Sequence, residues 1–256
     1  MSGRDGAAPR FVVHAYSFPK DEAHPQDWED AAGYLVTGAE GWFAVADGAG
    51  SGYRVKEWAR HLVDGFLDAR PRTPRTTQDV LLRQRDRWPH AAPAREQSDV
   101  DWWEAMAAER LESAAAFAGV WARAPEDTDG NFHVYAIGDC CVLHVRGATL
   151  QVSFPVSAGQ AFSQSPTLLY SRPEKSPDPA GWIQFCTGQL RRGDMLVLAS
   201  DRLSQCLLEQ SAMTGAPVWQ AIRAVDRRSF QDLVRGLRDH GSLGVDDITL
   251  VRVCVI

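Results

Sequence analysis

Three aspartates at the boundaries of apolar segments are the residues in this sequence best suited to chemistry. Asp47 ends the segment AVADG, Asp201 ends LVLASD, and Asp246 precedes the terminal apolar run in DDITLV. Because the strands of a sheet end at common edges, these carboxylates can lie close together although they are distant in the chain. Carboxylates so placed repel and raise one another's pKa unless a cation sits between them. Taken singly, each aspartate also fits a turn or a helix cap, the commonest role of aspartate after a strand.

The ligand type predicts which ion such a cluster would hold. Carboxylate oxygens are hard ligands that favour magnesium, manganese or calcium. Zinc sites normally use more histidine or cysteine than these segments contain. The pattern therefore favours a divalent ion of the hard class.

The composition narrows the fold class, the partners and the compartment. The chain has 256 residues, 45% of them apolar, which suits one large α/β or α+β domain or two small ones. Its net charge of −6, with both signs interspersed, argues against nucleic acid as the main partner, because phosphate-backbone binding needs a concentrated basic surface. No apolar run is long enough to span a bilayer, and the start MSGRDGAAPR lacks a signal-peptide core. We expect a cytoplasmic protein without a membrane partner.

The five cysteines sit inside apolar stretches and form no CxxC pair. They predict reduced core residues of a cytosolic protein. The neighbours Cys140 and Cys141 leave a redox role open beside the structural one.

The pattern of the first half predicts strands followed by helices. Period-two and apolar runs indicate the strands, helical spacing of apolar residues indicates the helices, and Ser98 is a suitable N-cap for the second long helix. In order, we expect a flexible tail at 1–10, strands at 11–18, 31–36 and 42–46, a helix at about 53–69, a surface excursion with a short helix within 71–97, and a helix from 98 to about 121.

The second half returns to strands after the turn Asp129-Gly130. FHVYAIGDCCVLHVRG alternates with period two and predicts a hairpin interrupted by Gly138-Asp139. Further on we expect a long loop at 155–181, a strand near 182–186, the apolar β-rich run MLVLAS that ends at Asp201, helices at 203–209, 217–224 and 229–240, and a terminal strand in DDITLVRVCVI. This order lacks strict βαβα alternation and predicts an α+β sandwich of antiparallel sheets covered by helix pairs.

Five segments resemble, in the same order, the motifs of the type-2C, or PPM, metal-dependent Ser/Thr protein phosphatases. WEDA is similar to the family's (N/E)(E/Q)DA element, FAVADGAGSG to its DG motif, VYAIGDCCVLHVRG to its GDS-type hairpin, GDMLVLASDRLSQCLL to its LLLxSDG segment and DDITLVRV to its DNIT strand. Each motif is short, but the set spans about residue 11 to the C-terminus. ADGAGS and the GDSC-like hairpin resemble a bacterial subset most closely. The resemblance implies one domain over 11–256, with two antiparallel sheets flanked by antiparallel helix pairs.

The resemblance also implies a ligand set. Asp47 bridges two metal ions, the Gly48 carbonyl binds one of them, and Asp201 and Asp246 complete the first site. The expected ions are Mn²⁺ or Mg²⁺. Asp247 is interpreted as a neighbour that orients the loop, although a shift of register could exchange it with Asp246.

Two further acidic positions match outer parts of the family's site. By resemblance Asp30, together with Glu29, holds water around the metals, and Asp139 matches a third, more weakly occupied metal site. Glu29 fits a solvated turn charge equally well.

Departures from the family pattern affect substrate binding. Several members carry an arginine about five residues before the WED-like aspartate, where Pro25 stands here with His24 beside it. Arg202 replaces the glycine of the SDG motif, and Ala49 replaces a histidine found in some eukaryotic relatives. His24 and Arg202 are therefore the candidate phosphate-binding residues, although an exposed histidine and a solvent-facing arginine are the alternatives.

The implied activity is hydrolysis of a phosphorylated Ser/Thr protein, a kinase or its targets, by water activated between two divalent cations. One alternative is a pseudophosphatase that binds a phosphoprotein or kinase without turnover. Another is a metal-dependent hydrolase of nucleotides or small phosphate esters, although the sequence has no P-loop and no GxGxxG segment. The stretches 71–97 and 155–181 are the expected recognition surfaces.

Overall fold

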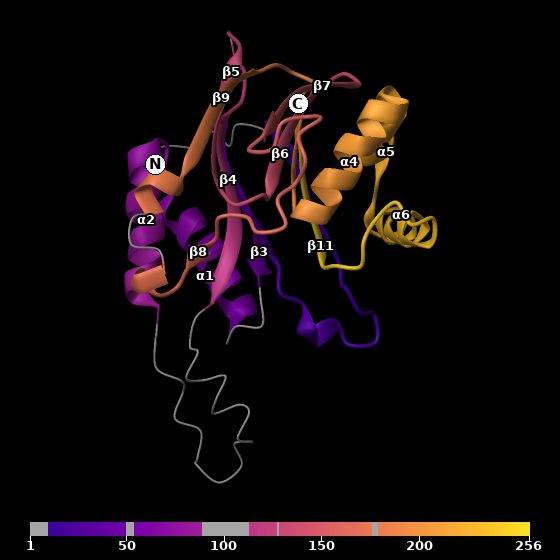
Figure 1. The fold of residues 1–256 in the computed structure, drawn as a ribbon. Coiled ribbons are helices and arrows are strands. Elements are labelled where there is room, and N and C mark those ends of the chain that lie inside the picture. Colours follow the sequence, from indigo (N-terminus) through magenta and orange to yellow (C-terminus); the bar gives the residue numbers. More distant parts are fainter. Residues whose placement is uncertain (1–9, 50–53, 89–112, 127, 176–178) are drawn as a thin grey trace, which may run out of the picture.

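A computed structural model describes residues 10–49, 54–88, 113–126, 128–175 and 179–256. Apart from residue 10, the expected flexible tail at 1–10 lies outside these ranges. Two antiparallel sheets lie face to face, with helices on both outer sides (Figure 1). The α+β sandwich predicted from the sequence is confirmed, whereas the assignment of 11–256 to one domain stays a prediction.

The sheets are built from strands that are distant in the sequence. The five-stranded sheet has the order β1 (Phe11–Phe18), β11 (Ile248–Val255), β10 (Met195–Ala199), β6 (Cys141–Arg146) and β7 (Thr149–Phe154). The six-stranded sheet has the order β2 (Ala31–Thr37), β3 (Glu40–Ala49), β4 (Ala114–Arg123), β5 (Gly130–Ile137) and β9 (Gln184–Leu190), with β8 (Leu169–Tyr170) paired to β4.

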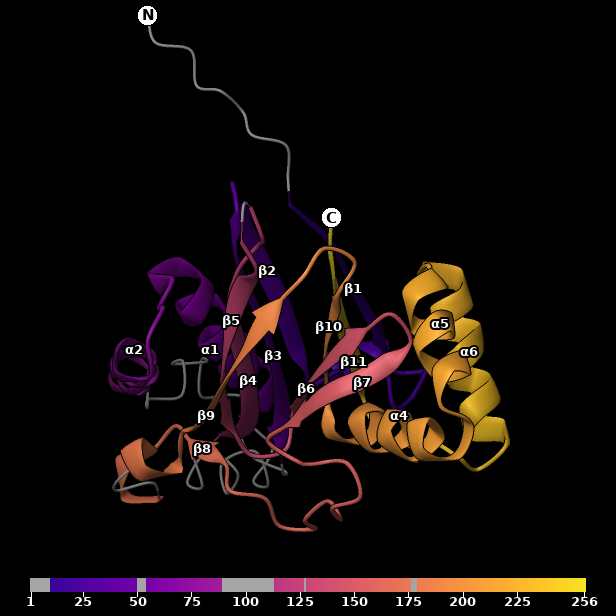
Figure 2. The ribbon, with the colours of Figure 1, turned by 90° about the horizontal axis from the view of Figure 1, so that it is seen from above.

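The helices cover the outer faces of the sheets in two groups (Figure 2). Helices α1 (Val55–Ala69) and α2 (Pro74–Arg87) lie on the six-stranded sheet, and α4 (Asp201–Thr214), α5 (Ala216–Ala224) and α6 (Arg227–Asp239) lie on the five-stranded sheet. A third apolar core fills the space between the sheets. None of the helices in the described ranges is long and apolar enough to cross a membrane.

The helix predicted from Ser98 to about 121 is wrong where the structure describes it. Residues 98–112 lie outside the described ranges, and the chain from Ala114 to Arg123 forms β4. This strand is paired on both sides and buried on both faces, so it lacks the polar alternation by which strands are recognised. Without that alternation, its alanine-rich sequence favours a helix, because alanine has the highest helix propensity.

The hairpin predicted around Gly138-Asp139 is also wrong. Strand β5 belongs to the six-stranded sheet and β6 to the five-stranded sheet, so the chain crosses between sheets at these two residues. Gly138 has φ +87°, and a Cβ there would lie 2.6 Å from the Cβ of Ala116. The crossing therefore needs glycine for both its backbone conformation and its closeness to β4.

Other boundaries shift without changing the architecture. The stretch 71–97 holds a 14-residue helix, α2, which Thr73 starts with a capping box followed by Pro74 at N1; residues 89–97 are not described. Strand β3 continues through Asp47 to Ala49, and the expected long loop contains the short strand β8. All five cysteines are free; Cys140, Cys141 and Cys206 are buried, as predicted, and the other two are partly buried.

Candidate metal centre and active site

Strand register in the six-stranded sheet places Asp30, Asp47 and Asp139 at one end. Ala31 pairs with Ala46, so the residue before β2 lies beside Asp47 near the end of β3. Asp47 itself pairs with Ala116 on β4. The next residue of β4, Phe117, pairs with Ile137, and the chain then leaves β5 toward Asp139.

The five-stranded sheet brings the other two aspartates to the same end. Ala199 at the end of β10 pairs with Cys141 on one side and Leu250 on the other. Asp201 therefore follows β10, Asp139 precedes β6, and Asp246 precedes β11 at one edge of the sandwich. In Figure 1 this is the lower end, where β3, β4, β11 and the start of α4 meet.

A cavity of about 410 Å³ opens between the sheets at this end. Its walls include Asp47, Gly48, Asp139, Asp201, Arg202, Asp246 and Glu29, together with part of the segment 162–168. The three aspartates on which the sequence argument rested therefore share one cavity. Asp30 is buried, with only 4% of its surface exposed, and lines a neighbouring cavity instead of this one.

Burial and mutual repulsion raise the pKa values of four carboxyls at this end, those of Asp30, Asp47, Asp139 and Asp201. Burial, with a further contribution from Asp247, Asp246 and Asp201, raises the pKa of Asp30 to about 8. Burial and the neighbouring carboxylates raise the pKa of Asp47 well above its ordinary value, and burial raises that of Asp139 to about 6. Burial and the neighbouring Asp246 also raise the pKa of Asp201. The pocket thus favours either protons or a cation among its oxygens.

The donor set fits a hard divalent cation. Asp30 Oδ2 is fully buried and has no hydrogen-bond partner among the described residues, which is costly unless something else binds it. The surrounding ligands are all oxygens, the type preferred by magnesium and manganese. No three acidic, histidine or cysteine side chains in the described ranges stand close enough to hold an ion as they are. Coordination would require the mutually repelling carboxylates to turn toward one another.

Gly48 is needed for the shape of the site as well as for its carbonyl. A Cβ at this position would lie 2.4 Å from Val55 Cγ1 and 2.6 Å from the Glu29 carbonyl oxygen. Because neither contact is tolerable, only glycine lets β3 approach the turn that carries Asp30. The DG pair therefore joins two parts of the carboxylate cluster.

Asp247 orients the loops around the cavity, as the sequence analysis interpreted it. Its two carboxylate oxygens accept hydrogen bonds from the backbone N–H groups of Lys20, at 2.7 Å, and Glu29, at 2.8 Å. Lys20 Nζ also pairs with Glu29 Oε2 at 2.7 Å. The start of β11 is thereby attached to the segment between β1 and β2, and Glu29 makes a defined ion pair at the cavity rim.

The two candidate substrate-binding residues lie in different places. Arg202 lines the cavity, half-exposed, with its Nε 3.9 Å from Asp201 Oδ2 and 3.7 Å from Asp246 Oδ2. Its guanidinium therefore lies beside two carboxylates and is also partly exposed to solvent. His24 is exposed, pairs with Asp21 at 2.8 Å and is absent from the described cavity lining, so its role in substrate binding stays a prediction without support from this cavity.

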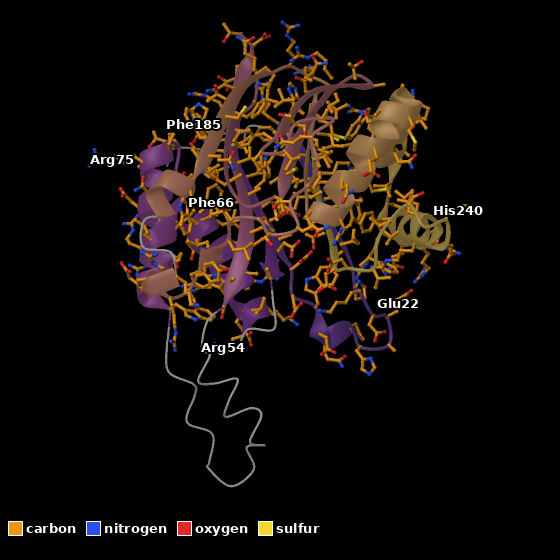
Figure 3. The ribbon with its side chains drawn as sticks, in the orientation of Figure 1. Glu22, Arg54, Phe66, Arg75, Phe185 and His240 are labelled. Carbon is orange, nitrogen blue, oxygen red and sulfur yellow. The ribbon has the colours of Figure 1, made fainter. Side chains whose placement is uncertain are left out.

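Arg238 is a functional candidate that sequence reasoning missed. From the last turn of α6 its Nη2 donates to the Asp246 carbonyl, and its Nη1 donates to the Pro19 carbonyl at 3.0 Å. Its guanidinium lies 4.9 Å from the Phe18 ring centroid. One turn earlier, Arg235 pairs with Glu22, which lies beside α6 (Figure 3). An arginine near a helix end carries no local motif, so only the folded structure shows this contact.

We expect Arg238→Ala to weaken Mn²⁺ binding about tenfold or more, because groups that orient metal ligands typically contribute that much. Isothermal titration with Mn²⁺ measures the effect directly and needs no turnover. The matched control is Arg235→Ala, which loses the contact with Glu22 but leaves Asp246 supported. Equal Mn²⁺ affinity in the two variants would contradict a positioning role for Arg238.

Cysteine-based phosphate chemistry is disfavoured by the geometry. Cys140 and Arg146 have the Cx5R spacing typical of cysteine phosphatases, but β6 separates them along its whole length. Arg146 is engaged with Asp194 through two hydrogen bonds of 2.8 and 2.9 Å. Burial, with the nearby aspartates, raises the pKa of the Cys140 thiol well above its ordinary value, so the thiolate is suppressed.

Comparison with known proteins assigns this arrangement to a family. The family profile described as protein phosphatase 2C matches residues 23–238. No curated protein sequence matches the chain.

Solved structures share the fold at low identity. The photosystem II phosphatase PBCP is 18% identical with a TM-score of 0.60, covering 96% of this chain and 99% of its own. The serine/threonine phosphatase PstP/Ppp of Mycobacterium tuberculosis is 14% identical with a TM-score of 0.56, covering 96% and 98%. The catalytic domain of the phosphatase PstP in complex with two manganese ions is 14% identical with a TM-score of 0.58, covering 96% and 98%. With a profile match over most of its length, the chain belongs to the protein phosphatase 2C family.

Proposed function

We propose that the protein is a metal-dependent phosphatase that hydrolyses phosphoserine or phosphothreonine in a protein substrate. The observation that carries this proposal is the cavity shared by Asp47, Asp201 and Asp246, next to the buried Asp30 with its unpartnered oxygen. The pKa values of Asp30, Asp47 and Asp201 are raised. Such a cluster is costly to fold without a cation. Its presence in a chain of this family supports turnover over mere binding.

The proposed roles follow from position. Asp47, the Gly48 carbonyl, Asp201 and Asp246 would hold two ions, Mn²⁺ or Mg²⁺. Asp139, on the same wall, would serve a third, weaker site. When bound, the ions would lower the pKa of a water so that hydroxide is available near neutral pH, and would offset phosphoryl charge.

Asp30 and Arg202 have different proposed roles. The buried Asp30 would hold a water near the ions through its free Oδ2. Arg202 faces the cavity, where its guanidinium can donate two parallel hydrogen bonds to a phosphoryl group. Because Arg202 also neighbours Asp201 and Asp246, it must turn partly away from them to grip phosphate. The proposed partner is a phosphorylated protein, either a Ser/Thr kinase or one of its targets.

The test is a Mn²⁺ titration with three substrates: p-nitrophenyl phosphate, a phosphoserine peptide and ATP. We expect Mn²⁺-dependent release of phosphate, with kcat/KM for the phosphopeptide at least about tenfold above that for ATP. Preference for ATP would replace the proposal by a nucleotide hydrolase. No turnover at saturating Mn²⁺, with an intact circular-dichroism spectrum and retained phosphopeptide binding, would indicate a pseudophosphatase.

A further inference from the structure

A second cavity of about 360 Å³ adjoins the carboxylate cavity. Phe162 and Gln205 line both, so these two side chains stand at the boundary between the two spaces. The second cavity lies between the segment 159–162 and the exposed side of α4. A peptide bound in the carboxylate cavity can therefore extend past Phe162 and Gln205 and continue along α4.

The lining of the second cavity combines an apolar surface with one negative charge. Phe162 is partly buried against the core of the five-stranded sheet, and the buried Leu208 and the exposed Ala212 add apolar surface. Glu209 is the one charged residue among the described residues that line it. Gln205 Nε2 donates to Glu209 Oε1 at 2.9 Å, which holds the carboxylate over the cavity.

We propose that this second cavity receives the polypeptide beside the phosphorylated residue and selects a basic side chain there. The proposal rests on the proposed phosphatase function and specifies its substrate class. A lysine or arginine has an apolar stem to lie against Phe162 and Leu208 and a cationic end to pair with Glu209. An acidic peptide residue would meet Glu209 with like charge.

Helix geometry sets the spacing between the phosphorylated residue and this basic residue. Asp201 and Glu209 are eight positions apart on α4, which corresponds to about 12 Å along the helix axis. An extended peptide covers about 3.3–3.6 Å per residue, so it spans this distance in about three to four residues. The selected basic residue therefore lies about three or four positions from the phosphoserine.

The experiment uses synthetic phosphoserine peptides that differ only in having Lys, Ala or Glu three or four positions to either side of the phosphoserine. For the wild-type protein with Mn²⁺ we expect kcat/KM for the best Lys peptide to exceed that for the matching Glu peptide about tenfold. Glu209→Lys should reverse the order while leaving hydrolysis of p-nitrophenyl phosphate unchanged, because that substrate is too small to reach the second cavity. The matched control is Asp68→Lys, the same charge change at an exposed position of α1 on the other sheet.

A binding arm separates failure of this proposal from failure of the phosphatase function. Fluorescence anisotropy of the same peptides with the Asp47→Asn variant reports the preference without turnover. Equal affinity for the Lys and Glu peptides, or a preference that survives Glu209→Lys, would overturn the second cavity as the specificity site. If p-nitrophenyl phosphate is still hydrolysed in that case, the phosphatase proposal stands. If the wild-type protein does not hydrolyse p-nitrophenyl phosphate but the preference for the Lys peptides is retained, the phosphatase proposal is wrong and the second cavity remains as a peptide-binding site.

Discussion

Asp47→Asn should reduce turnover of p-nitrophenyl phosphate at saturating Mn²⁺ by about a thousandfold or more, while metal-free stability stays unchanged or rises. The activity loss follows because Asp47 is proposed to bridge both ions, and catalysis by such ions supplies several kcal/mol of transition-state stabilisation. The stability result follows because burial and the surrounding aspartates raise the pKa of Asp47, so its ionised form is unfavourable in the folded state. Steady-state kinetics and thermal unfolding in EDTA measure the two effects.

Asp194→Asn is the matched control, since it makes the same chemical change at a carboxylate with the opposite environment. Burial alone would raise the pKa of Asp194, but hydrogen bonds from Arg146, the Arg191 N–H and His144 outweigh it and lower that pKa. Neutralising this group should destabilise the protein by about 3 kcal/mol, since it breaks a buried ion pair, and leave Mn²⁺ affinity unaffected. Retained turnover in Asp47→Asn would count against the whole catalytic scheme.

Without metal, the protein should lose stability as the pH rises from 5 to 8, by about 10 °C in Tm. Asp30 and Asp139 have folded pKa values of about 8 and about 6, above the ordinary value of 3.8. A raised carboxyl pKa means that the folded state holds more protons than the unfolded state across this range. Stability is therefore greatest at the acidic side and falls through the folded pKa values. Thermal unfolding in EDTA at several pH values measures the slope.

Saturating Mn²⁺ should reverse this dependence, because ions bind the deprotonated carboxylates and compete with protons. His144, whose pKa burial lowers, contributes an opposite slope below its ordinary value of 6.5, so the interval from pH 7 to 8 reports the buried carboxyls Asp30 and Asp47 best. Asp30→Asn is the control that should reduce the slope in this interval. Metal-free stability that is constant or rises between pH 7 and 8 in the wild type would contradict the carboxylate cluster.

Local pattern was enough to predict those parts of the fold that neighbouring residues decide. β1 has the bounds expected from FVVHAYSF, and α1 begins and ends within two residues of the expected helix. Alternation and helical spacing are properties of a few adjacent side chains, so they can be recognised without the rest of the chain. The motif set likewise predicted that Asp47, Asp201 and Asp246 would share a cavity, and they do.

Strand pairing between distant segments decided the two features of the fold that the local sequence pattern predicted wrongly. β4 is a strand because partners on both sides and cover on both faces override its alanine-rich sequence, and Gly138-Asp139 links two sheets because Ile137 and Cys141 find different partners. Such choices depend on contacts that no local window contains.

The amino-acid sequence by itself determined which residue types this protein can place at strand ends, and hence its family and its oxygen-ligand chemistry. Only the tertiary structure decided that Asp30 is buried with a free oxygen, that Arg238 supports the Asp246 loop, and that Glu209 lines a second cavity beside the first. The physical reason is that burial, pKa and cavity shape arise from the packing of segments that, like those of Lys20 and Asp247, lie as far as 227 residues apart. The sequence specifies which side chains each segment carries, and the packing fixes the environment of those side chains.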